Sequence, residues 1–188
     1  MAALVIRPAG PEDFASIEQL FGPRGACAGC WCMWWRAPKG GKDWTAAQGE
    51  PNRQRFRELV TAGRVHGLLA FDGDEPVGWC DLAPHADYPR LGRARKLQRE
   101  GRGETWSIPC FFIKRSYRRR GVASRLLQAA VAHAWTLGAG EIEGYPVGAG
   151  QSVDAFAYTG LPSMFEAAGF RPVPSTDPGS RTIYLKTR

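Results

Sequence analysis

The chain has 188 residues, 44% of them hydrophobic, and carries 25 lysines and arginines against 18 aspartates and glutamates. This size suits a single domain, residues 1–188, that buries one full core, and it argues against two domains. The sequence contains no 18-residue apolar span and no basic N-terminal stretch leading into a long apolar run. We therefore expect neither a membrane helix nor a secretory signal, and predict a cytoplasmic location.

A short strand and a helix are predicted at the start of the chain. Leu4–Arg7 has the composition of a strand. Pro11 follows at a position typical of the first residue of a helix, and apolar side chains then recur at helical spacing. Gly22-Pro23 should end this helix.

An unusual run of cysteine and tryptophan, residues 26–36 (ACAGCWCMWWR), comes next. The spacing of Cys27, Cys30 and Cys32 would let three thiolates hold a soft metal, but no nearby residue supplies a fourth ligand. Five cysteines is also an odd number for a disulfide framework. We interpret them as reduced thiols that pack as small apolar groups, and predict no metal site.

The middle of the chain predicts a helix and a hairpin, followed by a loop. Pro51–Ala62 is amphipathic, and the apolar runs Val65–Phe71 and Val77–Leu82 are joined by an Asp-Gly turn typical of adjacent antiparallel strands. Residues 83–103 lose periodicity and become basic. We predict an irregular loop there, which is either a plain surface segment or a cover over a functional site.

The segment from Trp106 to Leu137 carries the most informative pattern. A strand over Trp106–Ile113 leads through Arg118-Arg119-Arg120-Gly121 into a helix over Val122–Leu137. The first N–H groups of a helix lack intrahelical partners, and the helix dipole adds positive potential, so a diphosphate is favoured at this turn. Pro109 removes one donor from the strand and predicts a bulge there.

The spacing Arg118-x-x-Gly121-x-Ala123 resembles the acyl-CoA diphosphate loop of the GNAT N-acetyltransferase family. In that family the loop follows the fourth strand and opens a long helix; a fifth strand and a short helix ending in Gly-Phe come next. Glu141–Pro146 and Gly169-Phe170 stand in the corresponding order here. The resemblance is specific from about Trp106 to Phe170. It implies an α/β fold with a mixed, largely antiparallel central sheet flanked by helices, in which the fourth and fifth strands splay apart.

The resemblance also implies acetyl-CoA as co-substrate. The backbone of Phe111 and Ile113 would bind pantetheine as a substitute strand, and the Phe111 amide would polarise the thioester carbonyl. The segment after the first helix commonly forms one wall of the acceptor pocket in the family, so tryptophans 31, 34 and 35 are expected to line it. The expected cofactor-binding residues are Phe111, Phe112, Ile113, Arg118, Arg119, Arg120, Gly121, Val122, Ala123 and Ser124, and the expected acceptor-binding residues are Trp31, Trp34 and Trp35.

The net charge of +7 is concentrated in one part of the chain. Residues 88–120 hold eleven lysines and arginines but only two glutamates, so the remainder is slightly acidic. A local basic patch suits the phosphates of CoA. Because the window lacks stacking aromatics interleaved with the basic residues, we expect no nucleic-acid partner.

A base and an acid for the reaction are harder to assign. Some relatives carry a glutamate as the base at the position that Ser107 occupies here. The nearest remaining acids, Glu104 and Glu143, are therefore our candidates to accept the amine proton, directly or through water. On the predicted fifth strand, Ile142 faces the core while Glu143 and Tyr145 share the opposite face. Solvation at a sheet edge is the alternative explanation for the acids of this strand.

Many relatives carry a tyrosine four residues before the closing glycine, which returns a proton to the CoA thiolate. Counting back from Gly169 gives Phe165, which has no proton to donate. Either the thiolate leaves unaided, since a thiol pKa near 8.5 makes it a tolerable leaving group, or another hydroxyl substitutes. Tyr145 is our first candidate for this hydroxyl, ahead of Tyr158 and Ser163.

The sequence thus predicts an acetyl-CoA-dependent N-acetyltransferase. An amine of a small molecule or peptide would attack the thioester directly in a ternary complex, without an acetyl-enzyme. The alternative is a non-catalytic acyl-CoA-binding regulatory domain on the same fold. No membrane partner is expected, and a homodimer is left open.

Overall fold

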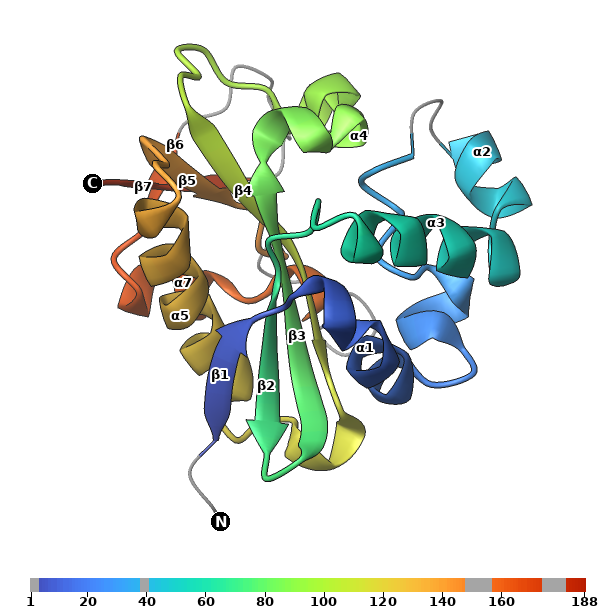
Figure 1. Ribbon diagram of the computed structural model, residues 1–188. Coiled ribbons are helices and arrows are strands. Elements are labelled where there is room, and N and C mark those ends of the chain that lie inside the picture. The colour runs from blue at the N-terminus through green and yellow to red at the C-terminus, as the bar shows by residue number, and fades with distance from the viewer. Residues whose placement is uncertain (1–3, 38–40, 148–156, 174–181) are drawn as a thin grey trace.

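The computed structural model describes residues 4–37, 41–147, 157–173 and 182–188. They form a seven-stranded sheet in the order β1-β2-β3-β4-β5-β7-β6, with helices on both faces (Figure 1). Every pair of neighbours is antiparallel except β4 and β5. The strands are β1 Val5–Pro8, β2 Leu68–Asp72, β3 Glu75–Pro84, β4 Thr105–Ile113, β5 Glu141–Gly144, β6 Arg171–Val173 and β7 Ile183–Thr187. The sheet confirms the predicted mixed, largely antiparallel α/β fold.

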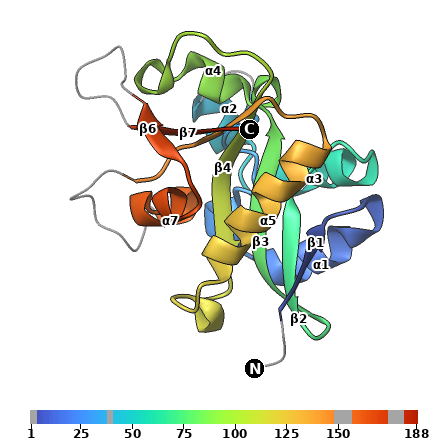
Figure 2. The same ribbon diagram turned by 90° about the vertical axis from the view of Figure 1, so that its left-hand side faces the viewer.

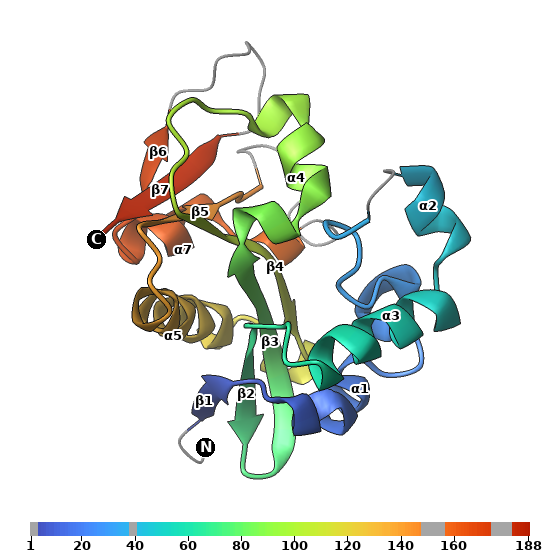
Figure 3. The same cartoon turned by 45° about the horizontal axis from the view of Figure 1, so that its top comes forward.

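Helices cover both faces of this sheet. The α-helices are α1 Phe14–Phe21, α2 Gly41–Ala46, α3 Glu50–Thr61, α4 Pro89–Arg93, α5 Val122–Thr136 and α7 Pro162–Ala167. Helices α5 and α7 lie on one face, and α1 and α3 on the other (Figures 2 and 3). Within the described ranges, none of the helices is both long enough and apolar enough to cross a membrane.

Three apolar clusters hold the layers together. The first joins α5 and α7 to the sheet, and Leu126 and Phe165 are completely buried in it. The second lies between the sheet and helices α1 and α3. The third gathers Trp35, Tyr88 and Tyr145 beneath α4. Since apolar burial contributes about 25 cal/mol per Å², these clusters fix the sheet between the two helical layers.

The N-terminal elements agree with the sequence, with small shifts at their ends. Strand β1 begins one residue later than predicted, and a 3-10 turn, Pro11–Asp13, precedes α1. Asp13 accepts hydrogen bonds from the Gly10 N–H at 2.7 Å and from Arg7 at 2.6 and 2.7 Å. The β2–β3 hairpin is confirmed, and pairs Asp72 with Glu75.

Strands β4 and β5 pair over only part of their length. Their parallel register ends at Ile108 opposite Gly144, whereas β4 continues to Ile113. On its other side β4 stays paired with β3 up to Ile113, and the register shifts by one residue around Pro109. The predicted bulge and the predicted splaying of the two strands are therefore both confirmed.

The prediction of an irregular loop over residues 83–103 was wrong for most of the segment, and only residues 98–103 form an irregular run. The segment contains two 3-10 turns, His85–Asp87 (η3) and Arg95–Leu97 (η4), with α4 between them. Tyr88, Leu91 and Leu97 are buried, and anchor these turns to the third cluster. Each turn is too short to show a helical period, which is why the pattern was missed.

Helix α5 begins and ends next to a glycine in the left-handed region. Gly121 is its N-cap with φ of 77°, and Gly138 follows its C-terminus with φ of 88°. Besides α4 and its flanking turns, the sequence analysis did not anticipate α2 and the strands β6 and β7. These strands extend the sheet beyond β5, so β5 is an interior strand.

Candidate functional site

The turn between β4 and α5 presents backbone N–H groups to open space. Arg119 adopts φ of 59° and Gly121 φ of 77°, both left-handed. Consecutive N–H groups in such a turn form a concave anion site, and the start of α5 adds its dipole. A Cβ added to Gly121 would meet no atom within 4 Å. The space in front of this glycine is therefore open to a diphosphate.

The arginines of this turn are exposed. Arg118 donates from Nε to the Ile113 carbonyl at 3.1 Å, and the Arg120 guanidinium lies 5.6 Å from the centre of the Tyr117 ring. Arg119 is exposed as well. These side chains give the turn positive charge without filling it, as the sequence predicts for a phosphate site.

The end of β4 supplies unpaired backbone next to this turn. Phe111 and Ile113 face the α5 side of the sheet, whereas Phe112 packs on the opposite face against Phe21, with ring centres 5.4 Å apart. Residues 109–113 have no sheet partner on the β5 side among the described residues. Apart from the Ile113 carbonyl, which accepts from Arg118, the N–H and C=O groups on this side need hydrogen-bond partners, and an extended amide chain would provide them.

Phe165 lies where β4 and β5 diverge. Its ring lies 6.3 Å from that of Phe111, and a Cβ on Gly144 would come within 2.0 Å of it. Phe165 is completely buried. Phe165, which the sequence places where relatives are expected to carry a tyrosine, therefore lies beside the end of β4 but has no hydroxyl.

A buried polar network lies on the opposite face of β5. The Tyr145 hydroxyl donates to Glu143 Oε2 at 2.7 Å and lies 2.8 Å from Ser107 Oγ. His85 Nδ1 lies 3.0 Å from Ser107 Oγ and 3.2 Å from the Tyr145 hydroxyl. Ser107, Glu143 and Tyr145 are all completely buried. We call these four residues the Ser107 network.

Two arginines from the 83–103 segment neutralise Glu143. Arg99 Nε donates to Glu143 Oε1, and Arg102 Nε donates to the same oxygen at 3.0 Å. Arg99 also pairs with Glu141. These arginines keep the pKa of Glu143 below its usual value despite its burial. Solvation at a sheet edge, the alternative explanation for Glu143, is therefore wrong.

These ion pairs also correct the expectation of one continuous basic patch for CoA. Arg99 and Arg102 lie near the start of β4 and β5, whereas residues 114–120 follow the end of β4. The length of a nine-residue strand, on the order of 30 Å, separates the two groups. The exposed arginines of the turn are the ones beside the proposed phosphate site.

The remaining members of the network are held neutral. Burial, and next the charge of Glu143, raises the pKa of Tyr145 well above its usual value. Burial and the charges of Arg102 and Arg99 lower the pKa of His85, with Glu143 acting in the opposite direction. Tyr145 therefore keeps its proton at neutral pH, while His85 is uncharged.

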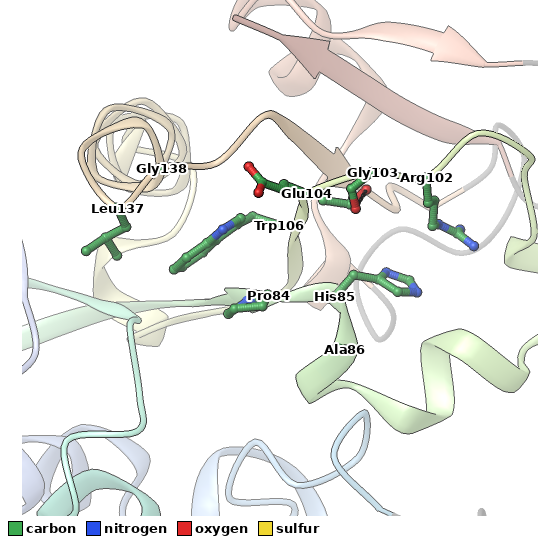
Figure 4. A pocket seen from close by; sticks show the side chains of 10 residues that line it. Pro84, His85, Ala86, Arg102, Gly103, Glu104, Trp106, Leu137 and Gly138 are labelled. Atoms are coloured by element: carbon green, nitrogen blue, oxygen red, sulfur yellow. Dashed lines mark hydrogen bonds between the residues drawn. The ribbon is translucent and has the colours of Figure 1, made fainter.

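Glu104 lies away from the network. It is exposed at the start of β4, seven residues before Phe111 and on the order of 20 Å from it along the strand. Glu104 lines a surface cavity of about 500 Å³ together with Trp106 and Leu137, with His85 and Arg102 at its other end (Figure 4). At this distance Glu104 does not reach an amine held at Phe111, even through one water.

The three tryptophans proposed for the acceptor pocket occupy different environments. Trp31 is buried between α1 and α3, with its ring centre 6.3 Å from that of Phe14. Trp34 is half-buried and stacks under the Arg90 guanidinium at 3.4 Å. Trp35 belongs to the same cluster as Tyr145. Trp34 and Trp35 thus lie on the side of the Ser107 network, whereas Trp31 is part of the second core cluster.

The cysteines do not form a metal cluster. Among the residues that the structure describes, no group of three or more histidine, cysteine or acidic side chains is arranged to hold a metal ion. All five thiols are free. Burial, followed by the charge of Cys32, raises the pKa of Cys30 to about 11. Such thiols stay protonated, and are poor ligands and poor nucleophiles.

A buried ion pair near the bulge escaped the sequence analysis. Arg36 donates to Asp81 Oδ1 at 2.9 Å and to the Tyr88 hydroxyl at 3.2 Å. Asp81 pairs with Cys110 at the point where the β3–β4 register shifts. The other carboxylate oxygen, Oδ2, has no hydrogen-bond partner in the described ranges. The partners are 45 residues apart, so no local pattern reveals them.

Solved structures with the same fold are acetyltransferases. PaiA N-acetyltransferase from Thermoplasma acidophilum, in complex with coenzyme A, is 18% identical, with 99% of both chains covered and a TM-score of 0.57. Mosquito arylalkylamine N-acetyltransferase like 5b is 14% identical, with 99% of this chain and all of the other covered and a TM-score of 0.61. The putative acetyltransferase yncA from Salmonella typhimurium, with its cofactor acetyl-CoA, is 13% identical, with 98% of this chain and 94% of the other covered and a TM-score of 0.55.

No curated protein sequence matches the chain significantly. A family model, however, matches residues 31–146, well over half of the 188 residues. Its description is the acetyltransferase (GNAT) family. The matched range runs from Trp31 through the β4–α5 turn to the end of β5. Together with the splayed β4–β5 pair, this match shows that the chain belongs to the acetyltransferase (GNAT) family.

Proposed function

We propose that this protein transfers the acetyl group of acetyl-CoA to the amine of a small molecule or peptide. One observation carries the proposal: β4 loses its β5 partner after Ile108 and leads, through a 3-10 turn at Arg115–Tyr117, to the left-handed turn at Gly121. The unpaired backbone suits the amides of pantetheine, and the turn suits a diphosphate. Both groups belong to CoA, and the neighbouring structures with coenzyme A and acetyl-CoA support this assignment.

Individual roles follow from this placement. The N–H groups at residues 119–124 and the charge of Arg118, Arg119 and Arg120 would hold the diphosphate. The backbone of Phe111 and Ile113 would hold pantetheine. The Phe111 amide would stabilise the negative charge that develops on the thioester oxygen during attack.

The acceptor would approach from the face that carries the Ser107 network and Trp34. An alkylammonium has a pKa near 10.4, so the amine must lose a proton before it attacks. Glu143 pairs with Ser107 next to the end of the β4–β5 pairing, and Tyr145 lies just past that end, which supports both as part of the proton-accepting machinery. The geometry does not support Glu104 in this role.

We keep Tyr145 in the catalytic site, but with a hydrogen-bonding role in place of the proton-donating role expected from the sequence. A thiol has a pKa near 8.5, below that of a tyrosine whose pKa is raised, so full proton transfer from Tyr145 to the thiolate is unfavourable. Its hydroxyl instead donates a hydrogen bond to Glu143, and its oxygen lies within hydrogen-bond distance of Ser107, so it holds both residues in place. The departing thiolate then takes its proton from the newly formed amide nitrogen.

A thiol-release assay tests the function. Purified protein is incubated with acetyl-CoA and a panel of alkylamines, aminoglycosides, polyamines and peptide N-termini, and free CoA and acetylated product are measured together. Amine-dependent release of CoA with matching product supports the transferase. Saturable acetyl-CoA binding without turnover on any amine would instead identify the non-catalytic regulator.

A further inference from the structure

His85 connects the buried hydroxyls of the Ser107 network with the surface cavity. Its Nδ1 faces Ser107 Oγ at 3.0 Å and the Tyr145 hydroxyl at 3.2 Å. Its side chain is 15% exposed and lines the cavity of about 500 Å³ at the end near Arg102 (Figure 4). The second ring nitrogen, Nε2, has no hydrogen-bond partner within the described part of the chain. The imidazole thus stands between buried polar atoms and solvent.

The charged groups around His85 disfavour a lasting positive charge on the ring. Glu143 Oε2 lies 3.7 Å from Nδ1, but this carboxylate already accepts hydrogen bonds from Arg99, Arg102 and Tyr145. After burial, the positive charge of Arg102 is the strongest influence that opposes protonation of the His85 ring. Because the ring is neutral at pH 7, Nδ1 can accept a proton and the resulting imidazolium readily releases one.

Among the described residues, Ser107 is the only side chain of β4 that forms a hydrogen bond with His85. It lies four residues before Phe111, on the order of 10 Å along a bulged strand, so one or two bound waters would bridge the remaining distance. The Tyr145 hydroxyl gives its own proton to Glu143. The Ser107 hydroxyl is therefore the group that can donate to Nδ1.

We infer that His85, acting through Ser107, relays the proton released by the acceptor amine from the buried site to the cavity. This inference rests on the proposed function. His85 touches no reacting atom; it is a positioning and proton-relaying residue. No sequence pattern marks His85, because it lies 22 residues before Ser107 and only the fold of η3 brings the two side chains together.

The relay moves one proton without a net change in the protein. The ammonium gives a proton, through water, to Ser107 Oγ as the serine proton passes to His85 Nδ1. The imidazolium then releases the proton on Nε2 to water in the cavity, which leaves the neutral ring with a proton on Nδ1. Exchange of this proton through water back to Nε2 restores the starting tautomer before the next cycle. The free amine attacks the thioester carbon, the C–S bond breaks, and the second amine proton neutralises the thiolate. The products are the amide, CoA thiol and one proton in solution.

The test compares pH profiles of kcat/KM for the wild type, His85→Asn and Ser107→Ala. Asparagine keeps a polar group near Nδ1 but does not titrate, so a purely structural role predicts the same fractional loss at every pH. The relay predicts a loss of at least about tenfold near pH 7, shrinking as pH rises toward the pKa of the amine, where the free amine no longer needs a base. His133→Asn, on the exposed side of α5, is the matched control and should behave like the wild type.

Chemical rescue provides a second readout. His85→Ala opens the cavity toward Ser107, and added imidazole should restore at least part of the activity, but not in Ser107→Ala. A pH-independent loss in His85→Asn, or wild-type rates in both variants, would overturn the relay while leaving the transferase intact. If the wild type binds acetyl-CoA but acetylates no amine, the proposed function fails and the relay fails with it.

Discussion

Replacing Glu143 by glutamine is the change that most sharply tests the buried network. The Glu143 side chain is 0% exposed, and the two arginines that it neutralises are 7% and 17% exposed. Glutamine preserves the size of the side chain but leaves positive charge without a partner in a low-dielectric interior. Breaking a buried ion pair by removing one partner costs about 3–5 kcal/mol. Because Arg99 keeps Glu141, we expect the lower end, about 3 kcal/mol.

For a chain of this length, each kcal/mol lowers Tm by about 2–4 °C, so Glu143→Gln should melt about 6–12 °C below the wild type. Thermal and urea unfolding followed by circular dichroism measure the change. Glu75→Gln is the matched control, because its ion pair with Lys114 is exposed and should contribute little. Equal melting temperatures for the two variants would refute the view that the ion pairs of Glu143 fasten the 83–103 segment to β5.

Three further predictions concern the loop, the tyrosine and pH. Acetyl-CoA at about 100 times its Kd should stabilise the wild type by about 2.7 kcal/mol. Gly121→Val should lose this thermal shift, and Gly138→Val, which alters an equally left-handed glycine at the other end of α5, should keep it. An unchanged shift in Gly121→Val would refute the assignment of the phosphate loop. Tyr145→Phe should lower kcat at least about tenfold with little change in acetyl-CoA affinity, and wild-type turnover would show that its hydroxyl plays no part. The pKa of Glu143 is lowered in the folded state, so its contribution to stability is present above the usual carboxyl pKa and is lost as pH falls through the folded pKa. The free energy of unfolding should therefore decline between about pH 5 and 2 more steeply in the wild type than in Glu143→Gln.

Local patterns allowed the cofactor side of the fold to be predicted. The bulge at Pro109, the turn at Gly121 and the start of α5 each depend on residues within a few positions of one another. Proline lacks an N–H, and glycine adopts a left-handed backbone easily, so both leave a direct signature in the sequence. Strand β4 and helix α5 were therefore placed within one residue of their observed bounds.

The acceptor side could not be predicted because long-range pairing creates it. Arg99 meets Glu143 across 44 residues, and Arg36 meets Asp81 across 45. Alternation along β5 correctly put Glu143 and Tyr145 on one face, but whether that face is solvated or buried depends on β7 and on the 83–103 segment. His85 sits in a three-residue turn, which has no period to detect.

The fate of the acetyl group tests the central claim most directly. Acetyl-CoA with an isotope-labelled acetyl group is incubated with the protein in the absence and in the presence of an acceptor amine, and the label is followed on protein and amine by mass spectrometry. Direct transfer predicts no covalent label on the protein without amine, labelled amine equal to the CoA released once amine is added, and no transfer by Gly121→Val. Covalently labelled protein in the absence of amine, or undiminished transfer by Gly121→Val, would contradict the account.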